Sequence, residues 1–155
     1  MSPAAKTTRN SAALISGVSL LLMAVIAGLA NFGAIEGVLV PGDPGATAAN
    51  IVATERVFRL GVFGLGVVAL LDVIVAWGLY ELFRREQPHL ALLGGWFRLA
   101  YAAGFTVVIS ELLVAARVAN TDAPMALLHM ERFTEGWMLG LMVFGAGFLH
   151  YPPKL

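Results

Sequence analysis

Two ionisable residues lie inside long apolar stretches of the sequence, Asp72 in ALLDVIV and Arg98 in GWFRLA. A charge at such a depth in a membrane costs at least several kcal/mol unless it is paired or hydrated. Counted along each helix, Asp72 lies about 15 Å and Arg98 roughly 9–12 Å from the same membrane face. An arginine side chain can bridge that difference, so we expect an Asp72–Arg98 ion pair.

A second ion pair is expected near the opposite membrane face. Glu111 lies toward the far end of the third apolar stretch, at the level where Arg59 enters the neighbouring one. Two interpretations stay open for these charges. Complementary pairs at matching depths favour a structural role in fixing helix register. The functional alternative is a polar pocket or proton path lined by Asp72, Arg98, Ser110 and Glu111.

The segment MALLHMERFTEG carries the only candidate metal ligands, His129, Glu131 and Glu135. Glu131 and Glu135 are four residues apart and share a helix face, whereas His129 is offset from it. Because no recognised ligand spacing such as HExxH is present, this is a weak candidate. We interpret the three residues as solvated charges and predict no metal site.

Other chemistry has little support in the sequence. Cysteine is absent, which excludes disulfides and thiolate chemistry. His89 and His150 lie near the ends of apolar stretches rather than inside them, so no cofactor is predicted. The net charge is +0, which gives no footprint for nucleic acid. Neither a nucleotide-binding loop nor a nucleophile elbow occurs.

Composition identifies the medium that positions these residues. Hydrophobic residues make up 59% of the 155 residues and charged residues only 13%, about half the charge of a soluble domain. Because about 20 apolar residues are needed to cross a bilayer, four stretches qualify as spans. We predict an all-α bundle of four transmembrane helices in a single integral membrane domain, residues 1–155. The expected spans cover about 12–34, 58–82, 90–116 and 133–151.

Basic residues orient the predicted bundle, although their bias is slight. One side would carry a short hairpin and the other two longer loops. We expect the hairpin and both termini to be cytoplasmic, in a bacterial inner membrane. The hairpin side would hold Lys6, Arg9, Arg84, Arg85 and Lys154, and the outer side Arg56, Arg59, Arg117 and Arg132.

Glycines spaced four residues apart indicate where helices approach closely. Gly33 and Gly37 form one such pair, and Gly136 and Gly140 another. In lipid, this spacing allows backbone contact that bulky residues would block. Packing within the chain is favoured over self-association.

The first outer loop has strong turn signals in Pro41-Gly42-Asp43-Pro44-Gly45. We expect a sharp turn there. Thr47 would then act as the N-cap of a helix that starts outside the hydrocarbon and continues into the second span.

Three segments also carry a family resemblance: VPGDPGATAANIVATERVFRLG, LLDVIVAWGLYELFR and LALLGGWFRLAYAA. They resemble the bacterial membrane protein family known as domain of unknown function 4386. The resemblance covers Ser11 to about Phe148 and implies a multi-helix integral membrane protein without an assigned reaction, cofactor or substrate. Family members generally continue with further hydrophobic segments, so the resemblance implies a shortened member.

Three function classes follow from these observations. The favoured one is a non-enzymatic accessory or assembly subunit that packs in the lipid bilayer with itself or with other membrane subunits. The first alternative is a binder or carrier of a small apolar molecule in a pocket near Asp72 and Arg98. The weakest is a membrane enzyme that uses Asp72 or Glu111 as acid or base, because no supporting motif accompanies them.

Overall fold

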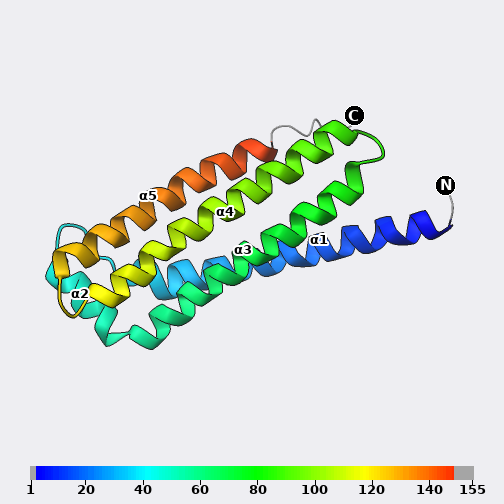
Figure 1. Cartoon of the computed structure of the whole chain (residues 1–155). Helices are drawn as coiled ribbons and strands as arrows, with labels where there is room; N and C mark the ends of the chain where they lie inside the picture. Colours follow the sequence, from blue (N-terminus) through cyan, green and yellow to red (C-terminus); the bar gives the residue numbers. More distant parts are fainter. Residues whose placement is uncertain (1–2, 149–155) are drawn as a thin grey trace.

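The computed structural model describes residues 3–148, with side chains for residues 10–142. Within this part the chain is helical and contains no strand (Figure 1). Three predicted features lie outside these residues: the end of the expected fourth span, His150 and Lys154. The α-helices are α1 (Pro3–Ala30), α2 (Pro44–Ala53), α3 (Glu55–Phe83), α4 (Pro88–Val118) and α5 (Ala123–Phe148); the π-helix η1 (Asn31–Ile35) and the 3-10 helix η2 (Glu36–Val38) follow α1.

Three helical segments are long and apolar enough to cross a membrane: Asn10–Val38, Glu55–Phe83 and Pro88–Val118. They correspond to the first three expected spans. The described part of α5 is not among them. Its first half carries Glu131, Arg132 and Glu135, and these charges lower its apolar character.

Small residues bring α1 and α3 together as antiparallel neighbours. Gly61 lies against Ala30 at the end of α1 and Ala34 in η1, and Gly78 lies against Ser16 near the opposite end of the interface. A side chain at either glycine would overlap these neighbours, which explains why the backbones can approach so closely. Gly33, of the first predicted glycine pair, has open space around it instead.

The helix α4 lies between α3 and α5 (Figure 1). Gly136 and Gly140 of α5 pack against Val108 and Tyr101 of α4, so the second predicted glycine pair does mediate packing within the chain. Extensive contacts thus link α1 to α3, α3 to α4, and α4 to α5. No comparable contact joins α1 to α5 among the described residues.

The loop at residues 41–45 turns where the sequence indicates, but the residue that caps the following helix differs. Gly42 has a φ of 75°, a conformation that favours glycine. Asp43, not Thr47, is the N-cap of α2, because its Oδ1 accepts a hydrogen bond from Ala46 N at 2.9 Å. Thr47 is buried and exchanges hydrogen bonds with the backbone of Val40. The expected cap was therefore wrong. Pro44 suits the first position of a helix, so α2 starts earlier in the sequence than Thr47 would allow.

The α2 helix lies across the end of the molecule opposite the α3–α4 hairpin (Figure 1). It ends at Ala53 and is separated from α3 by Thr54, so the expected uninterrupted helix is broken there. Its buried Ala48 and Ile51 join the core, and the helix packs against α5. Packing against the bundle thus accounts for its apolar side.

The loop between α4 and α5 is short, whereas the sequence predicts a longer one. α4 ends at Val118 and α5 begins at Ala123, ten residues before the expected fourth span. Asp122 accepts a hydrogen bond from Met125 N at 3.0 Å and so starts the helix early. The Asp-Ala-Pro sequence is the signal for this start.

Candidate functional site

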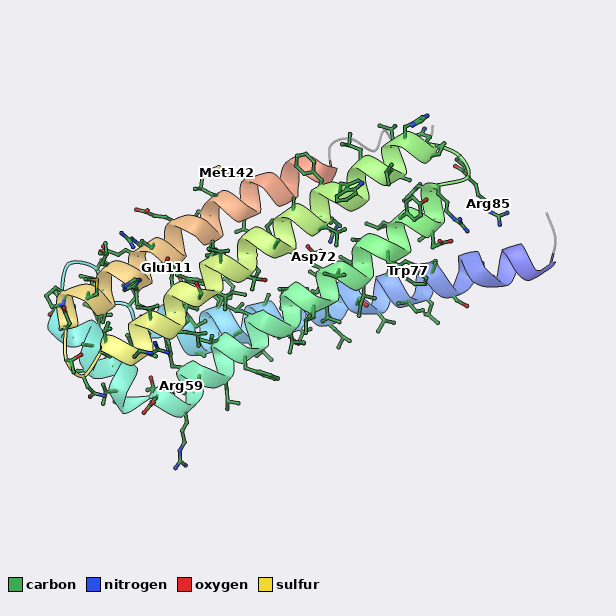
Figure 2. The ribbon with its side chains drawn as sticks, viewed as in Figure 1. Arg59, Asp72, Trp77, Arg85, Glu111 and Met142 are labelled. Carbon is green, nitrogen blue, oxygen red and sulfur yellow. The ribbon has the colours of Figure 1, made fainter. Side chains whose placement is uncertain are left out.

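Asp72 and Arg98 form an ion pair between α3 and α4, in the arrangement that the sequence predicts. Arg98 Nη1 donates a hydrogen bond to Asp72 Oδ1. The Asp72 side chain is 1% exposed and the Arg98 side chain 12% exposed, so both charges are removed from the surroundings of the helices. Figure 2 shows Asp72 pointing from α3 toward the inside of the molecule.

The second carboxylate oxygen of Asp72 takes no part in the ion pair. Oδ2 is buried and has no hydrogen-bond partner among the described residues. The Ser16 hydroxyl on α1 is buried and unpartnered in the same sense. A buried acceptor without a partner typically costs about 1–3 kcal/mol. Only one of the two Asp72 oxygens is therefore stabilised by Arg98.

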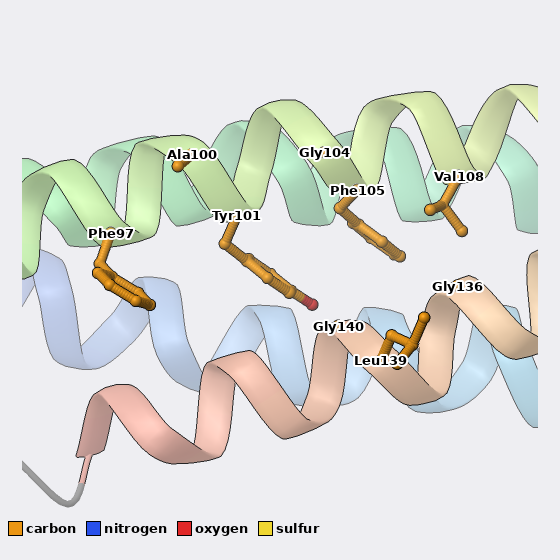
Figure 3. A pocket seen from close by; sticks show the side chains of 9 residues that line it. All are labelled: Phe97, Ala100, Tyr101, Gly104, Phe105, Val108, Gly136, Leu139 and Gly140. Atoms are coloured by element: carbon orange, nitrogen blue, oxygen red, sulfur yellow. The ribbon is translucent and has the colours of Figure 1, made fainter.

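Tyr101 connects this ion pair to a groove between α4 and α5. The phenol lies close enough to Asp72 and Arg98 to be influenced by both charges. Its ring stacks on that of Phe105, with centroids 5.8 Å apart and an interplanar angle of 8°. Phe97 lies one turn before Tyr101, so three aromatic rings follow one side of α4 (Figure 3).

The groove has a volume of about 480 Å³, within the range of roughly 300–1,000 Å³ typical of small-molecule sites. Phe97, Ala100, Gly104 and Leu139 are exposed, so it opens to the outside. Its walls are apolar except for the Tyr101 hydroxyl. The residues that line it are Phe97, Ala100, Tyr101, Gly104, Phe105, Val108, Gly136, Leu139 and Gly140.

The expected pair of Glu111 with Arg59 is not formed. Arg59 binds Glu55 one turn earlier on its own helix at 2.9 Å, and it points away from the bundle (Figure 2). Glu111 contacts His129 of α5, with Oε2 and Nδ1 2.5 Å apart. The early start of α5 brings His129 beside α4, so Glu111 has a partner on α5 rather than on α3.

The expected polar pocket is likewise not assembled. Ser110 is exposed and donates a hydrogen bond to Val107 O at 2.6 Å within its own helix. Glu111 lies thirteen residues from Arg98 on α4, about 20 Å along the axis. The Asp72–Arg98 and Glu111–His129 pairs are therefore separate polar contacts rather than one relay.

The weak metal candidate does not form a cluster. His129 is engaged by Glu111, while Glu131 and Glu135 are exposed. In the part of the chain that the structure describes, no group of three or more His, Cys, Asp or Glu side chains could hold a metal ion.

Sequence reasoning missed two features of the surface. The first is the aromatic row of the α4–α5 groove, which the spacing of Phe97, Tyr101 and Phe105 at every fourth residue could have indicated. The second is a set of small residues on the outside of α1, spaced four, seven and four residues apart: Ala13, Gly17, Ala24 and Gly28.

Comparison with known proteins gives one family match, which covers most of the chain. Residues 15–151 match a family described as a domain of unknown function, DUF4386. No curated protein and no solved structure matches the chain. With nearly the whole chain covered by this match, the protein belongs to the DUF4386 family.

Proposed function

We propose that this protein is a non-enzymatic accessory or assembly subunit that packs in the bilayer with itself or with a larger membrane complex. The observation that carries the proposal is the unpartnered surface of α1. In the most apolar window of its span, 22% of the residues are buried, against 44% for the Glu55–Phe83 span. Of the first three spans, α1 therefore has the most surface left for a neighbour.

The outer surface of α1 has the features of a helix-packing face. Gly17 and Gly28 have no atom within 4 Å of an added Cβ. Together with Ala13 and Ala24 they form a strip of small residues on one side of the helix. In lipid, such strips let a second helix approach closely, where dispersion contacts and weak hydrogen bonds stabilise the pair.

Gentle extraction followed by native mass spectrometry tests this role. We expect the wild-type chain to carry a stoichiometric protein partner or a second copy, and Gly17→Leu to lose it. The matched control is Gly66→Leu, a glycine on α3 that also has open space around it. A lone wild-type monomer, or equal loss in both variants, contradicts the proposal.

The proposal also places α5 across the membrane as a fourth span, with both termini cytoplasmic in a bacterial inner membrane. Support comes from its position alongside α4 (Figure 1) and from the contacts of Gly136 and Gly140 along α4. The α3–α4 hairpin, with Arg84 and Arg85, would then face the cytoplasm.

A second candidate function is favoured by the groove between α4 and α5. Its size and its apolar walls suit a binder or carrier of a small apolar molecule, and neither Asp72 nor Arg98 lines it. Gly104→Leu would fill the groove without disturbing the helices, because an added Cβ meets no atom within 4 Å. We expect this variant to release a copurifying apolar molecule that the wild type and Gly66→Leu retain; retention by all three contradicts this function.

An acid–base enzyme is the weakest alternative. Asp72 is bound by Arg98 and Glu111 by His129, and no group of side chains that could hold a metal ion occurs among the described residues. An isolated ionisable pair lacks the further groups that such chemistry requires.

A further inference from the structure

We propose that a second groove, between α3 and α4, binds one phospholipid of the surrounding bilayer, with an acyl chain in the groove and the phosphate at Arg85. This site is separate from the α4–α5 groove and does not depend on the functions proposed above.

The groove fits a hydrocarbon chain. Its volume is about 340 Å³, and none of its lining residues is charged. Four come from α3 and four from α4: Val73, Ala76, Trp77, Tyr80, Leu92, Gly95, Trp96 and Leu99. Each set covers seven residue steps of helix, or about 10 Å.

The direction of the groove matches the direction of a lipid in one leaflet. α3 and α4 are joined by the hairpin after Phe83, so Tyr80 and Leu92 lie at the hairpin end and Val73 and Leu99 lie deeper. Trp77 and Trp96 are 49% and 65% exposed, which places two indole rings on the outer rim. Such rings favour the boundary between headgroups and hydrocarbon, so the shallow end lies at headgroup level.

Polar groups are available at that shallow end. Arg85 is exposed at the hairpin and forms no ion pair among the described residues (Figure 2). Its neighbour Arg84 is bound to Glu81 at 2.8 Å and is therefore largely neutralised. The Tyr80 hydroxyl makes no hydrogen bond within the described part of the chain, so it adds a second donor. A guanidinium binds two phosphate oxygens at once, which favours a phosphate over a neutral headgroup.

Gly95 gives the groove its depth. An added Cβ at this position meets no atom within 4 Å, so the space above it is open. An empty apolar space beside lipid would forfeit dispersion contacts, whereas an acyl chain restores them. A phospholipid is the bilayer component that carries such a chain directly below a phosphate, and it therefore satisfies both ends of the site.

Native mass spectrometry of the full chain, stripped of lipid in detergent and titrated with dioleoyl phosphatidylglycerol, tests the proposal. We expect Arg85→Gln to weaken binding of the first lipid about tenfold, since one charge-assisted contact is lost. Gly95→Leu should weaken it by about tenfold or more because the side chain occupies the groove. Dioleoylglycerol, which has the same chains without the phosphate, should bind the wild type about as weakly as the phospholipid binds Arg85→Gln.

Two controls distinguish this site from general lipid contact. Arg56→Gln removes an exposed arginine at the other end of α3, and Gly66→Leu adds a leucine outside the groove; both should bind like the wild type. Equal weakening in Gly95→Leu and Gly66→Leu overturns the proposal, as does wild-type affinity in Arg85→Gln or for dioleoylglycerol. Arg85 lies in an exposed turn, so its variant tests the site even if a groove variant unfolds.

Discussion

At the scale of single residues, the Asp72–Arg98 ion pair is the most deeply buried charged contact between the long apolar helices. The Asp72 side chain is almost fully buried and the Arg98 side chain is largely buried, and the two carry opposite charges. Removing one partner of a buried pair leaves the other charge uncompensated, which typically costs about 3–5 kcal/mol. The pair therefore ties α3 to α4 at one register.

We predict that Asp72→Asn and Arg98→Gln each lower the free energy of unfolding by about 3–5 kcal/mol, and that the double variant loses less than the sum. Chemical unfolding in detergent, arranged as a double-mutant cycle, measures this coupling. If the effects add, the two side chains do not act as a pair. If the single variants stay stable yet lose a measured activity, the register explanation fails in favour of a functional role.

The N-cap of α2 is a second residue-scale feature. Asp43 binds Ala46 N and lies next to the positive-φ residue Gly42. We predict that Asp43→Ala destabilises the first turn of α2 by about 1 kcal/mol, the usual value of a lost cap. Faster hydrogen exchange of α2 amides would report this, with unchanged exchange in α4 as the internal control. Unchanged exchange in α2 would show that Thr47 and the packing on α5 hold the helix without the cap.

At the scale of helices, glycine positions decide how close neighbours lie. A Cβ at Gly78 would overlap the Ser16 hydroxyl and approach Ala12 O to 3.2 Å. The α1–α3 interface thus has no space for a larger side chain at Gly78. Gly66 on the same helix faces open space instead, and this makes the two glycines a matched pair.

We predict that Gly78→Ala destabilises the protein by about 1–3 kcal/mol through overpacking. Gly66→Ala should be neutral or stabilising by about 0.5–1 kcal/mol, because alanine is the better helix former. Ser16→Ala should partly rescue Gly78→Ala, since it removes the overlapping hydroxyl. Thermal unfolding of the four proteins decides the point; equal behaviour of the two glycine variants would mean that α1 is not held closely against α3.

At the scale of the whole molecule, the helices form a chain of neighbours in the order α1, α3, α4 and α5, with α2 across one end. Such an arrangement leaves α1 and α5 with the largest outer surfaces. Both helices therefore offer the most room for contact with another subunit.

The absence of cysteine makes the membrane topology directly testable with single introduced cysteines. We predict that Gln87→Cys is labelled by an aqueous reagent from one side, and that Gly45→Cys and Thr121→Cys are labelled from the other. Leu70→Cys and Val107→Cys should not be labelled by the aqueous reagent. The native side chains are 68% and 66% exposed on the outside of the helices, where lipid would exclude water.

Met142 tests the fourth span by the same method. Its side chain is 72% exposed and points outward from α5 (Figure 2). If α5 crosses the bilayer, Met142→Cys will be shielded like Leu70→Cys. Free labelling at Met142 would leave the protein with three spans.

The sequence by itself predicted the all-helical fold, the first three of its four expected spans as long apolar helices, and the Asp72–Arg98 pair. Hydropathy depends on local composition, and a charge deep in an apolar stretch has few partners to choose from, so both can be inferred without coordinates. The turn at Pro41-Gly42 follows equally from local backbone preferences.

Tertiary structure alone decided the partner of Glu111, the position of Ser110 and the existence of two grooves. Arg59 could reach either Glu55 or Glu111 by sequence, and only the rotation of α3 selects Glu55. Likewise, His129 becomes a partner because Asp122 starts α5 early and Gly136 lets it pack closely on α4. Helix rotation and interhelical distance depend on many weak contacts summed over whole interfaces, and these sums cannot be read from the spacing of a few residues.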